Sequence, residues 1–121
     1  HLERFAELLG VDHRIEWVGY VPEAELGDYY ASADLFVSPS LAEPFGITIT
    51  EALSAGTRVV ATESGVNEVL PEESVVEVEP DSKSIAAGIE RALDLDGRPE
   101  FDPITWADVV DETLTFYHGI L

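Results

Sequence analysis

The sequence predicts an α/β fold in which a parallel sheet carries helices on both faces. Three observations predict it: short apolar segments with the length of buried strands, longer segments with apolar residues at helical spacing, and a regular alternation of the two. Such alternation is typical of parallel β-α units, whose strands are covered on both sides. The predicted strands are residues 14–18, 35–38, 58–61 and 75–78.

Residues that favour helix ends support the helices predicted between these strands. Pro22 suits the first position of a helix, where its missing N–H would have no partner, and Thr105 is a candidate N-terminal cap. Gly10 and Gly56 are placed to end helices in the left-handed conformation. The predicted helices are residues 2–9, 22–33, 46–55, 84–95 and 105–117, with at most a short helix at 67–70. Residues 96–103 are the expected linker before the last helix.

The length and composition predict one domain with one hydrophobic core. The chain has 121 residues, of which 45% are hydrophobic, and a globule of this size buries roughly two-thirds of its unfolded surface. The sequence contains no cysteine, which excludes a disulfide framework and a thiolate metal site. His1, His13 and His118 lie far apart without metal-ligand spacing, so we expect them to be surface residues.

The charge balance is strongly acidic, with 25 Asp and Glu against 6 Lys and Arg and a net charge of −19. Because neutralising phosphates needs clustered Lys and Arg, this balance argues against a nucleic-acid partner and against binding to an anionic membrane surface. The acids are spread along the chain, and Lys83 is the only lysine. This pattern is typical of a halophilic protein, since about 1 M salt screens repulsion beyond about 3 Å. An ordinary acidic domain is the alternative.

Two carboxylates, Glu43 and Glu51, lie eight positions apart across a turn that ends an apolar strand and opens a helix. The backbone N–H groups of Phe45, Gly46 and Ile47 fall at the helix N-terminus, where orphan donors and the macrodipole attract anionic oxygen. Gly46 also lets a ligand approach the backbone closely. In parallel sheets, ligands bind beyond the carboxyl ends of the strands. The arrangement therefore predicts a ligand site.

A plainer interpretation applies to each glutamate alone. A glutamate on a helix is most often a solvated surface residue, and one in a loop is most often an unremarkable acid. The spacing of Glu43 and Glu51, the Phe-Gly pair between them and the position at a strand end favour the site.

Residues 39–56 resemble the E-x7-E signature of retaining glycosyltransferases of family 4 (group 1), which have two Rossmann-like domains in the GT-B fold. Flanking segments match in the same order. Residues 18–22 are similar to the strand and loop near the nucleotide base, residues 25–34 to the following helix, and residues 105–106 and 116–117 to the closing helix. The resemblance extends from about Ile15 to Tyr117. It implies a Rossmann-like, incomplete four-stranded portion of a C-terminal nucleotide-sugar domain.

The resemblance also implies roles for the residues of the motif. Glu51 would bind the ribose hydroxyls of the nucleotide sugar, since a carboxylate can accept hydrogen bonds from two vicinal hydroxyls at once. Glu43 would be the catalytic residue, with an electrostatic or positioning role as positive charge develops at the anomeric carbon. The backbone of Phe45, Gly46 and Ile47 would face phosphate or sugar hydroxyls.

Three further binding residues follow from the same resemblance. Val21 and Pro22 would contact the base. Glu68 resembles the acid that follows the family's Gly-Gly pair, although Val66 stands where a glycine is usual. This loop is an expected phosphate contact.

Other departures limit what this chain can do alone. Arg58 stands where the family commonly has a proline. The family's diphosphate-binding Arg and Lys and its acceptor-binding N-terminal domain belong to segments before His1, and residues 1–5 read as the middle of a helix. We therefore expect residues 1–121 to be one domain cut from a longer enzyme and to be inactive alone.

The resemblance implies a cytoplasmic transferase, with a parent protein at the cytoplasmic face of a membrane as one variant. Its donor substrate would be a UDP-, GDP- or ADP-sugar, with no cofactor and no metal required by the motif. The acceptor would be a sugar, lipid or protein bound through the N-terminal domain. The alternative is a non-catalytic homologue that serves as a regulatory or assembly module, and the altered loop at residues 65–67 favours it slightly.

The family's strand order, 3-2-1-4-5-6, would leave the strand at residues 14–18 without a neighbour, because strands 1 and 2 are absent. Unpaired strand edges are costly when buried and adhesive when exposed. We expect either that residues 14–18 move beside residues 35–38 and close the sheet, or that two chains pair as a homodimer.

Overall fold

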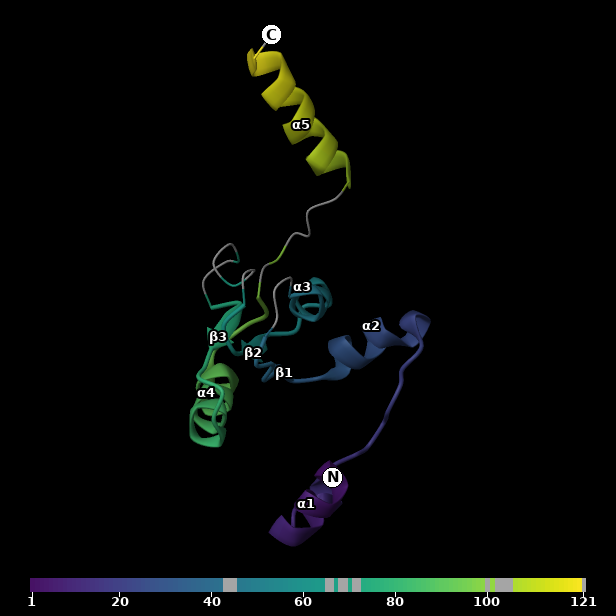
Figure 1. Cartoon of the computed structure of the whole chain (residues 1–121), viewed down its shortest axis with the longest axis vertical. Helices are drawn as coiled ribbons and strands as arrows, with labels where there is room; N and C mark the ends of the chain where they lie inside the picture. Colours follow the sequence, from purple (N-terminus) through teal and green to yellow (C-terminus); the bar gives the residue numbers. More distant parts are fainter. Residues whose placement is uncertain are drawn as a thin grey trace.

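The structure is a computed structural model that describes residues 1–42, 46–64, 67, 70, 73–99, 101 and 106–120. Its centre is a sheet of three parallel strands in the order β1 (Phe36–Ser38), β2 (Val59–Ala61) and β3 (Val75–Glu77), seen in Figure 1. Phe36 lies opposite Val59, which lies opposite Val75. All three strands therefore end at the same edge of the sheet.

Helices of the described residues lie before, between and after the strands in the chain. They are α1 (Leu2–Leu9), the 3-10 helix η1 (Asp12–Arg14), α2 (Glu23–Ser32), α3 (Ile47–Ser54), α4 (Ser82–Asp94) and α5 (Trp106–Ile120). Helix α3 packs on β1 and β2 and also contacts α2, whereas α4 packs on β2 and β3. The predicted α/β class is confirmed, and the ends of the matching helices agree with the sequence interpretation to within about three residues.

The buried residues form two clusters, one on each face of the sheet. The first cluster comprises Tyr30, Ile49, Ala52, Leu53, Val59 and Ala61, and the second comprises Val60, Val78 and Ala92. Successive residues of β2 alternate between these clusters, as side chains of a strand must. Because both faces are covered, β2 is buried along its whole length.

Turn residues behave largely as predicted. Gly10 (φ 71°) and Gly56 (φ 82°) follow helices in the left-handed conformation that favours glycine. Pro22 precedes α2 as its cap rather than forming its first residue. Asn67 has the 3-10 conformation, and Thr105 lies outside the described residues.

The predicted strand at residues 14–18 is wrong. Arg14 ends η1, and Ile15 begins an extended segment whose side chains are exposed. It does not lie beside β1 to close the sheet: β1 pairs with β2, and the sheet of the described residues has three strands rather than four. The apolar composition of the segment favours a strand, but a strand also needs a partner. The homodimer stays a prediction.

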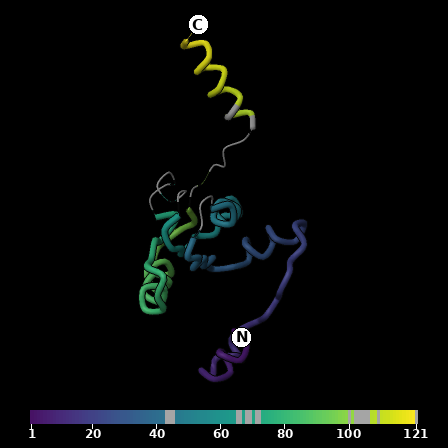
Figure 2. Tube along the Cα trace, viewed as in Figure 1, coloured from purple at the N-terminus to yellow at the C-terminus, as the bar shows by residue number. Residues whose placement is uncertain are grey.

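Helices α1 and α5 lie away from the sheet. Figures 1 and 2 show them at opposite ends of the molecule, with residues 15–22 leading from η1 to α2. Helix α1 contacts η1, and its apolar residues Leu2, Phe5, Leu8 and Leu9 are all exposed. The packed core is therefore formed by the sheet with α2, α3 and α4.

Arg58, just before β2, stands where the resemblance leads us to expect a proline, and it joins segments at the amino end of the sheet. Its side chain is 8% exposed, and its guanidinium donates to the carbonyl oxygens of Glu73 (3.0 Å), Leu95 (3.2 Å) and Asp96 (3.5 Å). A buried cation needs such partners. The departure from the family pattern thus has a structural explanation.

Candidate functional site

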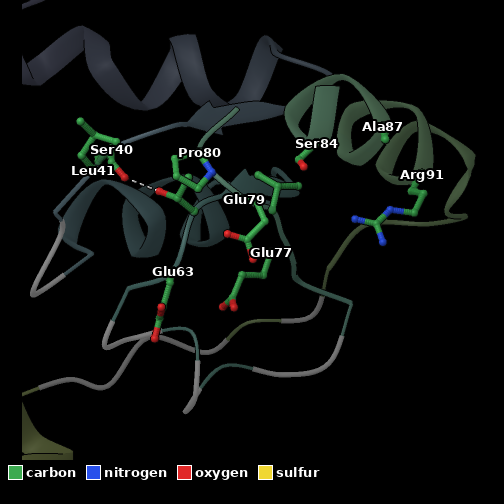
Figure 3. A pocket seen from close by; sticks show the side chains of 11 residues that line it. Ser40, Leu41, Glu63, Glu77, Glu79, Pro80, Ser84, Ala87 and Arg91 are labelled. Carbon is green, nitrogen blue, oxygen red and sulfur yellow. Dashed lines mark hydrogen bonds between the residues drawn. The ribbon is translucent and has the colours of Figure 1, made fainter. Parts of the chain in front are cut away.

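The carboxyl ends of the three strands border a cavity of about 680 Å³, shown in Figure 3. Its lining residues follow β1 (Ser40, Leu41), follow β2 (Thr62, Glu63), end or follow β3 (Glu77, Val78, Glu79, Pro80), or belong to α4 (Ser84, Ala87, Arg91). This is the edge at which parallel α/β sheets bind ligands. The sequence interpretation expects a ligand site at this edge of the sheet.

Hydrogen bonds join the loops at this edge. The hydroxyl of Thr62 donates to the carbonyl of Ser40, which links the ends of β1 and β2. The side-chain amide of Asn67 donates to the carbonyl of Thr62 (3.2 Å) and to the carboxylate of Glu77 (2.9 Å), which links β2 to β3. Ser64 completes the network by donating to Asn67 (2.9 Å). The cavity wall is therefore held by side chains rather than by the strands alone.

The sequence interpretation missed Glu63, Glu77, Glu79 and Arg91 as lining residues. All three acids occur just before or just after the carboxyl end of a strand, and that position is a signal that could have identified them. Arg91 could not be found in this way, because only the packing of α4 brings its side chain to the cavity.

Helix α3 begins at Ile47, and Gly46 caps it in the left-handed conformation (φ 61°, ψ 34°). A side chain at this position would be strained, so glycine is favoured here for its backbone as well as for close approach. The Ile47 side chain is 61% exposed. The first residue of α3 is thus open to solvent.

Glu51 lies on the second turn of α3, and its side chain meets a tyrosine of α2. The hydroxyl of Tyr30 donates to Oε2 of Glu51 at 3.2 Å. Tyr30 is 8% exposed, whereas Glu51 is exposed. The carboxylate is therefore held at one oxygen by a group from the core and is open to a ligand on its outer side.

Burial raises the pKa of Tyr30, and the charge of Glu51 and the hydrogen bond to it raise this pKa further. Each cause disfavours the phenolate: burial removes water from it, and the neighbouring carboxylate repels it. Tyr30 consequently remains a neutral hydrogen-bond donor at neutral pH and leaves the charge of Glu51 available.

The structure brings part of the predicted set together. Gly46, Ile47 and Glu51 lie on or at the start of α3. Val21 and Pro22 lie at the opposite end of α2 from Tyr30, roughly 12 Å along the helix axis, and Figure 1 shows that end turned away from the sheet.

The predicted catalytic residue Glu43 and the predicted binding residues Phe45 and Glu68 lie outside the described residues. Glu51 does not line the cavity, so the two features are separate parts of the described structure.

Neither a metal site nor a membrane-spanning helix is found among the described residues. No group of three or more His, Cys, Asp or Glu side chains is arranged there to hold a metal ion. Within the same residues, the helices are too short or too polar to cross a membrane.

The sequence of this chain matches a known family. The family described as glycosyl transferases group 1 matches residues 1–95. The chain belongs to this family. The family resemblance seen in the sequence is thereby confirmed at the level of the family.

Curated relatives agree with this assignment. An uncharacterized glycosyltransferase of Methanocaldococcus jannaschii is 35% identical over 97% of this chain and 33% of its own length. A phosphatidylinositol N-acetylglucosaminyltransferase component from Arabidopsis thaliana is 33% identical over 99% of this chain and 29% of its own length. The chain therefore spans about a third of the length of these relatives.

Solved structures support the GT-B-like fold. Sucrose-phosphate synthase from Thermosynechococcus elongatus superposes with a TM-score of 0.70 and 35% identity, covering 76% of this chain and 24% of the synthase. The catalytic domain of starch synthase IV from Arabidopsis thaliana, solved with ADP and acarbose, gives a TM-score of 0.63 over 97% of this chain and 28% of that chain. Its 18% identity bears on the fold alone.

Proposed function

We propose that this chain forms part of the C-terminal, donor-binding domain of a longer retaining glycosyltransferase, which transfers a hexosyl group from a nucleotide-diphosphate sugar. The observation that carries the proposal is the Glu51 carboxylate on α3, held at one oxygen by Tyr30 at 3.2 Å and exposed to solvent. A carboxylate has about four acceptor sites, so one hydrogen bond from Tyr30 leaves enough for two ribose hydroxyls. Family membership supports the same reaction class.

The remaining residues of the motif would act around the ribose. Glu43 would stabilise the positive charge that develops at the anomeric carbon. The backbone at Phe45, Gly46 and Ile47 and the acid Glu68 would meet the phosphates or the sugar. The acceptor would bind through an N-terminal domain, and this chain alone would not turn over.

The test is nucleotide binding by the full-length protein that contains this chain. UDP, GDP and ADP are titrated calorimetrically into the wild type and into Glu51→Gln, which keeps the shape of the side chain but removes its charge. Hydrogen bonds to a charged group contribute about 1.5–3 kcal/mol, so we expect Glu51→Gln to weaken the preferred nucleotide about 10- to 100-fold. Glu90→Gln, at an exposed acid of α4, is the matched control and leaves binding unchanged.

Turnover is measured with a panel of nucleotide sugars and acceptors on the same proteins. Transfer or donor hydrolysis that falls with Glu51→Gln and persists with Glu90→Gln supports the proposal. Absence of binding to all three nucleotides, or equal binding by wild type and Glu51→Gln, would contradict it.

A non-catalytic homologue is the second candidate, favoured by Val66 at a position where the family usually has glycine. A side chain there would hinder close approach of a phosphate to the backbone. The two functions differ in a simple way: a regulatory or assembly module keeps its fold but supports no transfer, even if a nucleotide binds. A full-length sequence that lacks the upstream Arg and Lys would favour the module.

A further inference from the structure

Tyr30 is a hydroxyl-bearing side chain inside an otherwise apolar cluster. It packs with Ile49, Leu53 and Val59, and it is 8% exposed. A phenylalanine would fill the same space without a hydroxyl that needs a partner. The partner found here, Glu51, is a residue for which the proposed function gives a role.

Two contacts fix where the Tyr30 hydroxyl can be. The ring meets Phe36 edge-on, with centroids 5.2 Å apart and an interplanar angle of 87°. The backbone carbonyl of Tyr30 accepts a hydrogen bond from the hydroxyl of Thr57, which follows α3. The hydroxyl position is therefore set by the core, and it changes little while α2, α3 and β1 stay packed.

Support of this kind matters for Glu51 because its side chain is exposed. A glutamate on an exposed helix face samples several rotamers, and ordering a side chain of this kind costs up to about 2 kcal/mol of conformational entropy. A hydrogen bond from a rigid donor reduces that cost before any ligand arrives. Because Tyr30 is neutral, it orients the carboxylate without neutralising it.

We propose that Tyr30 is a positioning residue, whose hydroxyl holds Glu51 in the orientation that accepts both ribose hydroxyls of the nucleotide. This inference rests on the proposed function, in which Glu51 is the ribose ligand. It predicts that the hydroxyl of Tyr30 affects the recognition of ribose specifically, rather than the affinity for nucleotides in general.

The experiment uses the full-length protein and compares UDP, GDP and ADP with their 2′-deoxy counterparts, each titrated calorimetrically. In the wild type, the ribonucleotide binds more tightly than its 2′-deoxy form, because the latter lacks one of the two hydroxyls. Tyr30→Phe should weaken the preferred ribonucleotide about 3- to 10-fold, as expected for one net hydrogen bond, and weaken the 2′-deoxy form less. The ratio of the two affinities therefore shrinks.

Tyr29→Phe is the matched control, since Tyr29 is the neighbouring residue of α2 and is 47% exposed. It should leave both affinities unchanged. Tyr30→Phe keeps the ring and therefore the core contacts, and its thermal midpoint is measured to verify that the fold is retained.

The outcomes separate this inference from the proposed function. If Glu51→Gln removes the preference for ribose but Tyr30→Phe leaves it intact, or weakens both nucleotide forms equally, the positioning role is overturned and the proposed function stands. If Glu51→Gln itself leaves the preference unchanged, or if no nucleotide binds the wild type, the proposed function fails and this inference fails with it.

Discussion

The two faces of the sheet are packed in different ways. On the face covered by α2 and α3, the buried cluster includes a tyrosine whose hydroxyl reaches a carboxylate at the surface. On the face covered by α4, the cluster of Val60, Val78 and Ala92 contains no polar side chain, and Gly88 of α4 is buried against it. The same strands thus support one hydrophobic cluster that has a polar connection to the surface and one that is apolar.

This difference indicates what each face contributes. A buried hydroxyl must find a hydrogen-bond partner, and that requirement makes its position specific. Close packing of a helix on a sheet stabilises the strands. The α3 face therefore connects the core to the candidate ribose ligand, whereas the α4 face keeps the strand ends and the cavity wall in place.

The largest expected effect concerns the charge of the whole chain and therefore both faces together. With a net charge of −19, mutual repulsion destabilises the compact state, and salt relieves it. We expect the thermal midpoint to rise steeply between low salt and about 2 M KCl, beyond the range in which simple screening saturates. A series of thermal scans by circular dichroism measures it.

The thermal midpoints of variants with a substitution on either face should rise with salt in parallel with that of the wild type. The two faces are therefore compared at one fixed salt concentration. A midpoint that stays flat across the series would contradict the halophilic interpretation and leave the ordinary acidic domain.

The next largest effect is expected from a substitution that disturbs the packing of α4 on the sheet. A Cβ at Gly88 would lie 2.3 Å from Cγ1 of Val78 and 3.2 Å from Cγ1 of Val60, so α4 could not keep its distance from the sheet. We expect Gly88→Ala to lower the free energy of unfolding by about 1–3 kcal/mol, as overpacking does in other cores. Urea unfolding measures it.

Gly27→Ala is the matched control, because a Cβ at this helical glycine meets nothing within 4 Å. Alanine is the better helix former, so stability should rise by up to about 1 kcal/mol. If both substitutions change stability alike, the contact at Gly88 does not hold the α4 face. Binding of nucleotide by Gly88→Ala, under conditions where it remains folded, should stay closer to wild type than binding by Glu51→Gln.

Much of the fold could be predicted from local patterns. Apolar runs identified β1, β2 and β3, and glycines marked helix ends, because these signals act within a few residues. The segment at residues 14–18 carried the same signal, but pairing depends on a second strand elsewhere in the chain. The local pattern could not reveal that residues 14–18 pair with no strand among the residues that the structure describes.

The candidate site likewise has a part that local sequence predicts and a part that depends on tertiary packing. Glu51 could be identified from its spacing to Glu43 and from the family resemblance. The bond from Tyr30 could not, because the two residues are 21 positions apart and meet only when α2 packs on α3. From the sequence, Tyr30 was one apolar position of a helix, and only tertiary packing gives its hydroxyl a role.

The smallest expected effect is at the N-terminus of α4, beside the cavity. Asp81 caps this helix: its carboxylate accepts hydrogen bonds from the backbone N–H and the hydroxyl of Ser84, both at 2.8 Å. Asp81→Ala should lower the thermal midpoint by a few degrees, because an N–H of the first turn loses its partner. Asp94→Ala, at the other end of α4, is the control and should cause no loss, since an acid there opposes the helix dipole.

The effect of Asp81 should also depend on pH in a definite direction. The hydrogen bonds from the backbone and side chain of Ser84 hold the pKa of Asp81 below its ordinary value. A lowered folded-state pKa means that the stabilisation is fully present above the ordinary value and is lost as the pH falls through the folded one. The difference in midpoint between wild type and Asp81→Ala should therefore be constant near neutral pH and shrink in acid. A difference that persists unchanged in acid would mean that the charge of the Asp81 carboxylate is not what stabilises this end of α4.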